Sequence, residues 1–138
     1  MKLTGDDLRT IALFESITGA RVIDMVPGDD VNTFLIRSSG AGRAIGKGAE
    51  NLRRFRELTG KRVNLFVHYP DEERFVRSLL HRFTVESIEV VEEEGRRIAL
   101  VRVAPVDKAR AIGRGGQNIR LISELARKHS TLDGVRIL

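Results

Sequence analysis

The hydrophobic positions in the first half of the chain change their period several times. They recur at helical spacing up to Gly19, and two β-rich runs follow at residues 20–26 and 31–37 with a Pro-Gly-Asp-Asp turn between them. A glycine-containing loop, an amphipathic segment that ends before Gly60 and a β-rich run at residues 62–68 complete this half. The pattern therefore predicts the order helix, strand, strand, short helix, helix, strand.

The same order of periods begins again after Pro70. The second half predicts a helix at residues 71–83, strands at 87–93 and 96–102 around a turn at Gly95, a short helix at 106–111, a helix that carries Ile119, Ile122 and Leu125, and a strand at 135–138. Each half is thus an αββααβ module. We expect two domains, residues 1–69 and 70–138.

Apolar faces can be assigned to two helices of the first module. Leu8, Ile11, Phe14 and Ile17 share the spacing of one helix face, and Leu52, Phe55 and Leu58 share another. This spacing favours two amphipathic helices.

Two segments of the chain are copies of each other. RAIGKGAENLRRFRELT at residues 43–59 and RAIGRGGQNIRLISELA at residues 110–126 are identical at nine of 17 positions. Two unrelated glycine turns would not repeat Arg-Ala-Ile-Gly, Asn and Glu-Leu in register. The chain therefore contains an internal duplication of a whole module.

The positive charge of the chain is concentrated in the duplicated segments. The whole chain carries 24 Lys and Arg against 19 Asp and Glu, a net charge of +5. Residues 37–62 hold eight basic and two acidic side chains, and residues 102–129 hold seven and two. The rest of the chain is acidic, which favours two basic surfaces and a polyanionic partner.

Composition argues against several classes of function. Cysteine is absent, and the three histidines, His68, His81 and His129, do not have metal-ligand spacing. No apolar run reaches the length of a membrane span, and the N-terminus does not resemble a secretion signal. We expect a cytoplasmic protein with no membrane association, no metal, no cofactor and no catalytic residues; it is not expected to be an enzyme.

The glycine loops carry the chemistry of a phosphate clamp. Ile112 precedes Gly113-Arg114-Gly115-Gly116, and Ile119 follows at the start of a helix. Glycines let the backbone approach a phosphate, and the N-terminus of the next helix offers unpaired N–H groups and partial positive charge. The candidate binding residues are Arg43, Ile45, Gly46, Lys47, Gly48, Ala49, Asn51 and Arg53 in the first copy and Arg110, Ile112, Gly113, Arg114, Gly115, Gly116, Asn118 and Arg120 in the second.

Other phosphate-binding loops fit less well. The stretch from Gly40 to Gly48 has five residues between its outer glycine and the Gly-Lys pair, where a P-loop has four, and Gly48 replaces the magnesium-binding Ser or Thr. Both copies also lack the third glycine of a dinucleotide fingerprint. Aromatic residues are only 5% of the chain, so base stacking on aromatic rings is not the expected mode of recognition.

The motif AIGRGGQNIRLI resembles the I-G-x-x-G-x-x-I signature of KH domains, and the tandem halves resemble the paired KH domains of the NusA family. The resemblance covers nearly the whole chain and is closest to the short archaeal form, without the polymerase-binding and S1 domains of bacterial members. It implies an α+β fold of two type II KH domains, each a three-stranded sheet with helices packed on one face. It also implies binding of single-stranded RNA and a role in transcription termination or antitermination, with RNA polymerase or other transcription factors as further partners.

Two points stay open at this level. A ribosome-associated or ribosome-assembly protein with the same fold is the alternative function, although the chain has no long basic tail. The first loop has Ala49 where the second has Gly116. If this position belongs to the first turn of the helix, alanine favours the helix by about 1 kcal/mol and only crowds the approach to phosphate. We then expect the first loop to fold but to grip less closely.

Overall fold

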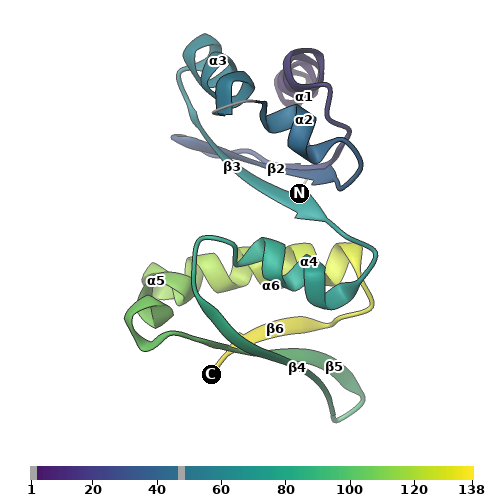
Figure 1. Cartoon of the computed structure of the whole chain (residues 1–138), viewed down its shortest axis with the longest axis vertical. Helices are drawn as coiled ribbons and strands as arrows, with labels where there is room; N and C mark the ends of the chain where they lie inside the picture. The colour runs from purple at the N-terminus through teal and green to yellow at the C-terminus, as the bar shows by residue number, and fades with distance from the viewer. Residues whose placement is uncertain (1–2, 47–48) are drawn as a thin grey trace. The chain divides into compact units, whose positions relative to one another are not determined.

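The computed structural model describes residues 3–46 and 49–138, and the chain divides into two compact units between His68 and Tyr69 (Figure 1). This division lies one residue before the expected boundary. Both units have the predicted αββααβ order. Among the described residues, none of the helices has the length and apolar character needed to cross a lipid bilayer.

The first unit is a three-stranded sheet with helices on one face (Figure 1). Strand β2 is central: it pairs antiparallel with β1 and parallel with β3. A parallel pair requires a crossover connection, and α2 and α3 provide it. The elements are α1 Gly5–Thr18, β1 Val22–Val26, β2 Val31–Arg37, α2 Ala41–Ile45, α3 Glu50–Thr59 and β3 Arg62–His68.

Three phenylalanines form the centre of the first core. Phe14 of α1 stacks on Phe34 of β2 with ring centroids 4.2 Å apart, and Phe55 of α3 meets both rings edge-on at 5.1 and 5.7 Å. All three side chains are fully buried, which joins both long helices to the central strand. The apolar faces are only partly buried, because Leu8 is 57% exposed and Leu58 is 61% exposed.

The second unit repeats this architecture with β5 in the centre of the sheet. Strand β4 pairs antiparallel with β5 through a two-residue turn, in which Glu94 and Gly95 both have positive φ. Strand β6 pairs parallel with β5 and forms one edge. The elements are α4 Glu72–Leu79, β4 Val85–Glu93, β5 Arg96–Val103, α5 Lys108–Ile112, α6 Gln117–His129 and β6 Gly134–Ile137.

Helix α4 is shorter than the sequence predicted. The amphipathic pattern continues to Phe83, but the helix ends at Leu79. Leu80 is fully buried, and the amide of Phe83 donates to the Leu80 carbonyl in a tight turn toward β4. Burial of Leu80 thus reverses the chain where local periodicity alone would continue the helix.

The carboxylate of Glu72 joins the start of α4 to β5 and to the segment between α6 and β6. It accepts hydrogen bonds from the Thr131 amide at 2.7 Å, from the Thr131 hydroxyl and from the Arg97 guanidinium at 2.7 Å. The hydrogen bond from the Thr131 hydroxyl lowers the pKa of Glu72 most, with further contributions from the Thr131 amide and Arg97. This carboxylate therefore connects three segments that are distant in sequence.

Candidate nucleic-acid interface

The second glycine loop is a sharp connection between α5 and α6. Gly113 has φ 81° and ψ 165°, a conformation that is essentially restricted to glycine. A Cβ atom at this position would lie 2.8 Å from the Asn118 backbone nitrogen. The turn Arg114–Gly116 follows, and α6 begins at Gln117. Gly113 therefore permits the close approach of the two helices, and Arg114 and Gly115 are exposed at the loop.

The first loop has the same form in its described part, and Lys47 and Gly48 lie outside the described residues. Gly46 has φ 80° and ψ 170°, close to the values of Gly113. Ala49 has φ 58° and ψ 31°, so the condition that it belongs to the first turn of the helix is not met. It caps α3 in a left-handed conformation, as Gly116 does for α6 with φ 78°.

Two predicted RNA-binding residues, Asn51 and Asn118, lie against the inner side of their loops. The Asn118 amide donates to the Ala111 carbonyl at 2.9 Å, and the Asn51 amide donates to the Ala44 carbonyl at 3.2 Å. These carbonyls belong to the last turns of α5 and α2, where helices leave acceptors without an internal partner. The duplicated asparagine thus holds the short helix against the start of the long one.

Two predicted arginines contact the protein around the second loop. The Arg120 guanidinium donates to the Gly115 carbonyl at 2.6 Å. Arg110 forms an ion pair with Asp107 at 2.7 Å, although its own side chain is mostly exposed. The Thr84 amide donates to the other oxygen of Asp107 at 2.8 Å and is the main cause of the lowered pKa of that carboxyl. Arg120 therefore supports the loop itself, and Arg110 supports the segment that leads into α5.

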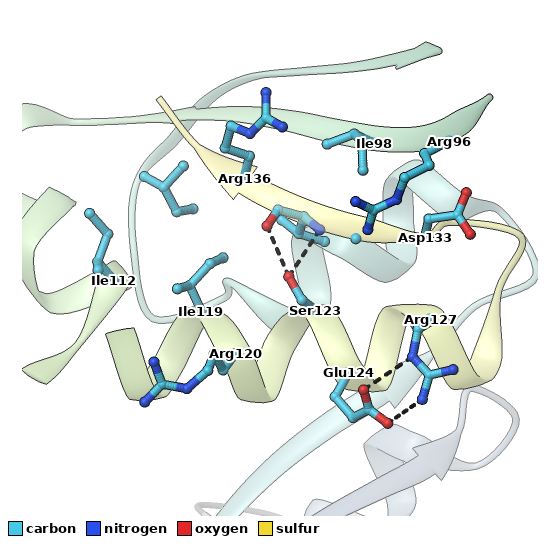
Figure 2. A pocket seen from close by; sticks show the side chains of 13 residues that line it. Arg96, Ile98, Ile112, Ile119, Arg120, Ser123, Glu124, Arg127, Asp133 and Arg136 are labelled. Carbon is cyan, nitrogen blue, oxygen red and sulfur yellow. Dashed lines mark hydrogen bonds and ion pairs between the residues drawn. The ribbon is translucent and has the colours of Figure 1, made fainter. Parts of the chain in front are cut away.

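A groove of about 620 Å³ runs beside the loop, between α6 and the sheet edge (Figure 2). Ile112 and Ile119, which the motif predicted as apolar groove residues, lie at one end, and Arg96 and Asp133 lie at the other. The residues that line the groove are Arg96, Ile98, Ile112, Ile119, Arg120, Ser123, Glu124, Arg127, Asp133, Gly134, Val135, Arg136 and Ile137.

Ser123 hydrogen-bonds both backbone groups of Val135 on β6. Its hydroxyl donates to the Val135 carbonyl at 2.9 Å and accepts from the Val135 amide at 3.0 Å. Backbone groups alternate in direction along a strand, and the Leu138 amide points toward β5, where it donates to Val101. The N–H and C=O of Ile137 are therefore directed to the same side as those of Val135, into the groove.

Sequence reasoning missed most of the groove beyond the motif. Ser123 and Arg127 follow Ile119 at intervals of four residues, so they share one face of α6, and this spacing was the available signal. Arg96 and Arg136 come from strands whose register the sequence does not reveal.

The groove arginines differ in their partners. Arg127 forms an ion pair with Glu124, and the hydrogen bond from Arg127 is the main cause of the lowered pKa of Glu124. Arg136 forms an ion pair with Glu93 at 2.9 Å. Arg127 and Arg136, which lie farther from the loop, are thus paired with carboxylates. Arg120, beside the loop, donates to a neutral carbonyl.

The corresponding hollow in the first unit is smaller, about 210 Å³, and more uniformly basic. Leu52 takes the place of Ile119, and Arg56 takes the place of Ser123. Arg53, Arg54 and Arg56 are all exposed on α3. The lining residues are Ala49, Leu52, Arg53, Arg56 and Val63, without a carboxylate. Over the described residues, no group of His, Asp or Glu side chains is arranged to hold a metal ion.

Comparisons with known proteins match both halves of the chain. The family model of the NusA-like second KH domain matches residues 72–130. Proteins described as probable transcription termination protein NusA match the chain from Halobacterium salinarum, at 31% identity over 99% of this chain and 98% of that protein, and from Halococcus morrhuae, at 32% identity over 99% of both. The relative from Methanococcus vannielii is 29% identical over 100% of this chain and 80% of its own length. The crystal structure of APE1850 superimposes with a TM-score of 0.71 at 33% identity, covering 99% of this chain and 100% of that one.

Proposed function

The chain belongs to the NusA family with tandem KH domains, and from this premise we propose that it is a transcription factor that binds single-stranded RNA through its two glycine loops. It acts in termination or antitermination in the cytoplasm, together with RNA polymerase or other transcription factors. The observation that carries the proposal is the groove of the second unit, which combines an exposed glycine loop, apolar side chains and a directed backbone edge.

Each part of this groove suits one part of an RNA strand. The amides at the start of α6, together with Arg114, bind phosphate, because the helix N-terminus carries partial positive charge. Ile112 and Ile119 support the flat faces of unstacked bases, and the N–H and C=O of Ile137 pair with a base edge. KH domains clamp about four nucleotides in this manner. A duplex hides its base edges, so single strands are preferred.

We further propose that the two units bind one strand with different roles. The second unit makes the closer contact, because its loop carries Gly116 and its groove is larger. The first unit contributes mainly charge through Arg53, Arg54 and Arg56. Lys47 and Gly48 belong to the sequence motif of the first loop and are part of this proposal.

The test is a titration of a labelled oligonucleotide against matched loop variants. Replacement of Arg114 and Gly115 by aspartate places two negative charges where phosphate is proposed to bind. A Cβ at Gly115 meets no atom within 4 Å, but its φ of +60° makes a substitution there strained. Circular dichroism of the loop variant therefore has to match the wild type before a loss of binding is assigned to the site. The control makes the same replacements at Gly5 and Arg9, which lie in the first turns of α1. We expect a loss of at least about tenfold for the loop variant and little change for the control.

Four further measurements test the proposal. Wild-type affinity falls with salt with a slope of magnitude about 3 to 6, for ~4 to 8 phosphates at ~0.7 each. A flat salt response, or equal affinity for duplex RNA, contradicts the clamp. Aspartates at Lys47 and Gly48 cause the smaller loss at high salt, where diffuse attraction is screened; a larger loss than at Arg114 and Gly115 reverses the assigned roles. Crosslinking in cells recovers nascent transcripts near terminators, whereas recovery of ribosomal RNA supports the ribosome-associated alternative.

A further inference from the structure

A second hollow adjoins the groove of the second unit around the edge of the sheet. It has a volume of about 360 Å³ and is lined by Glu93, Glu94, Arg96, Ile98 and Arg136. Three of these residues, Arg96, Ile98 and Arg136, also line the groove. The two hollows are therefore neighbours that share part of their lining on β5 and β6.

This second hollow lies on the face of the sheet that the helices leave open. Ala99 and Val101 of β5 are fully buried beneath the helices, so the alternating residues of this strand point to the other face. Arg96 is one of these, and it lies opposite Glu93 in the β4–β5 pair. Arg136 lies opposite Leu100 and shares this face.

The two arginines present positive charge where the groove meets the open face. Both are exposed. Arg136 is held by Glu93, but the side chains of this pair are 55% and 46% exposed. An ion pair with this exposure is weak, so a phosphate with higher charge density can displace the carboxylate.

We propose that an RNA strand bound in the groove continues across β6 onto the open face of the sheet, where Arg96 and Arg136 bind a further phosphate. Glu93 competes with that phosphate for Arg136. This inference rests on the proposed function of the groove. Because the carboxylates of Glu93 and Glu94 repel free RNA, the open face binds only a strand that the groove already anchors, which raises its effective concentration there.

The experiment measures binding of two oligonucleotides by fluorescence anisotropy at low salt. A four-nucleotide RNA fills the groove, and an eight-nucleotide RNA with the same core extends beyond it. Because Arg96 and Arg136 also line the groove, their replacement by glutamine is expected to weaken both RNAs. The loss for the longer RNA is expected to exceed the loss for the shorter one by about 3- to 10-fold. Arg102→Gln is the matched control, because Arg102 is an exposed arginine on the same face of β5 but lines neither hollow.

The Glu93→Gln variant tests the competition directly. It is expected to strengthen binding of the longer RNA by about 2- to 3-fold, since Arg136 loses its partner. This gain disappears when Arg136 is already glutamine. A weakening by Glu93→Gln, or a gain that persists in the Arg136→Gln background, overturns the competition.

The outcomes separate this inference from the proposed function. Equal losses for both RNA lengths, or a loss of the same size at Arg102, overturn the extension across β6, because the arginines then act only through diffuse charge. If aspartates at Arg114 and Gly115 leave the affinity for RNA unchanged, the proposed function is overturned, and the extension is overturned with it. Binding that depends on the loop, without a length-dependent loss at Arg96 and Arg136, overturns the extension alone.

Discussion

Replacement of Ala49 by glycine is expected to stabilise the first unit, because it relieves an alanine from the left-handed conformation. This conformation costs a residue with a Cβ about 1–2 kcal/mol. The greater freedom of glycine in the unfolded chain offsets about 0.4–1 kcal/mol. The two ranges leave a net gain of about 0–1.6 kcal/mol, and we take its middle part, about 0.5–1 kcal/mol, as the expected value. Since Ala49 caps α3 with φ 58°, glycine can take its place without moving the helix.

Native-state hydrogen exchange measures this change within one unit. The amides of Phe34 and Ile36 in the central strand exchange through unfolding of the first unit, so about 0.5–1 kcal/mol slows them about 2- to 5-fold. Amides of Val101 in the second unit serve as the internal control. Unchanged or faster exchange at Phe34 refutes the reasoning, since the alanine could then not be strained. The reverse change, Gly116→Ala, is expected to destabilise the second unit, where the new Cβ lies 3.1 Å from the Arg120 guanidinium.

Three other changes test the packing of the loops and the second unit. Gly113→Ala should cost at least about 2 kcal/mol in thermal unfolding, because its Cβ meets the Asn118 amide nitrogen and its backbone is restricted to glycine; a loss below about 0.5 kcal/mol would contradict this geometry. Gly42→Ala should raise stability by about 0.5–1 kcal/mol, since it lies within α2 and a Cβ there meets nothing within 4 Å; a lower melting temperature counts against it. The lowered pKa of Glu72 means that its contribution to stability is complete above the ordinary value of 4.5 and is lost as the pH falls through its folded pKa. Urea unfolding of Glu72→Gln should therefore depend less on acid below pH 4.5 than the wild type, and an unchanged dependence would rule this out.

Most of the fold could be predicted because both halves of the sequence show the same order of hydrophobic patterns. The αββααβ order follows from changes of period, and the strands at residues 31–37 and 62–68 have the predicted bounds. Local patterns fail where tertiary packing decides. Helix α4 ends early because Leu80 is buried in the turn, and Leu8 lies on a predicted apolar face but remains exposed.

Only the wall of the groove that the glycine-loop motif forms could be predicted from the sequence. The motif placed Ile112 and Ile119 beside the glycine loop, and both line the groove. The opposite wall comes from β5 and β6, and its residues depend on strand register that no local pattern reveals. Ala49 illustrates a second limit: its identity suggests a helical conformation, whereas the loop requires a left-handed one that Gly116 adopts without strain.

The hydrogen bonds of Ser123 also have a consequence for self-association. Strand β6 is an edge of its sheet, and an edge with unsatisfied backbone groups can recruit a strand from another molecule. The Ser123 hydroxyl occupies both backbone groups of Val135, in the middle of this short strand. A strand from a second copy could pair with β6 only after it displaced the Ser123 side chain from Val135. Ser123 limits the backbone groups of β6 that a base can reach. By the same hydrogen bonds it opposes edge-to-edge aggregation.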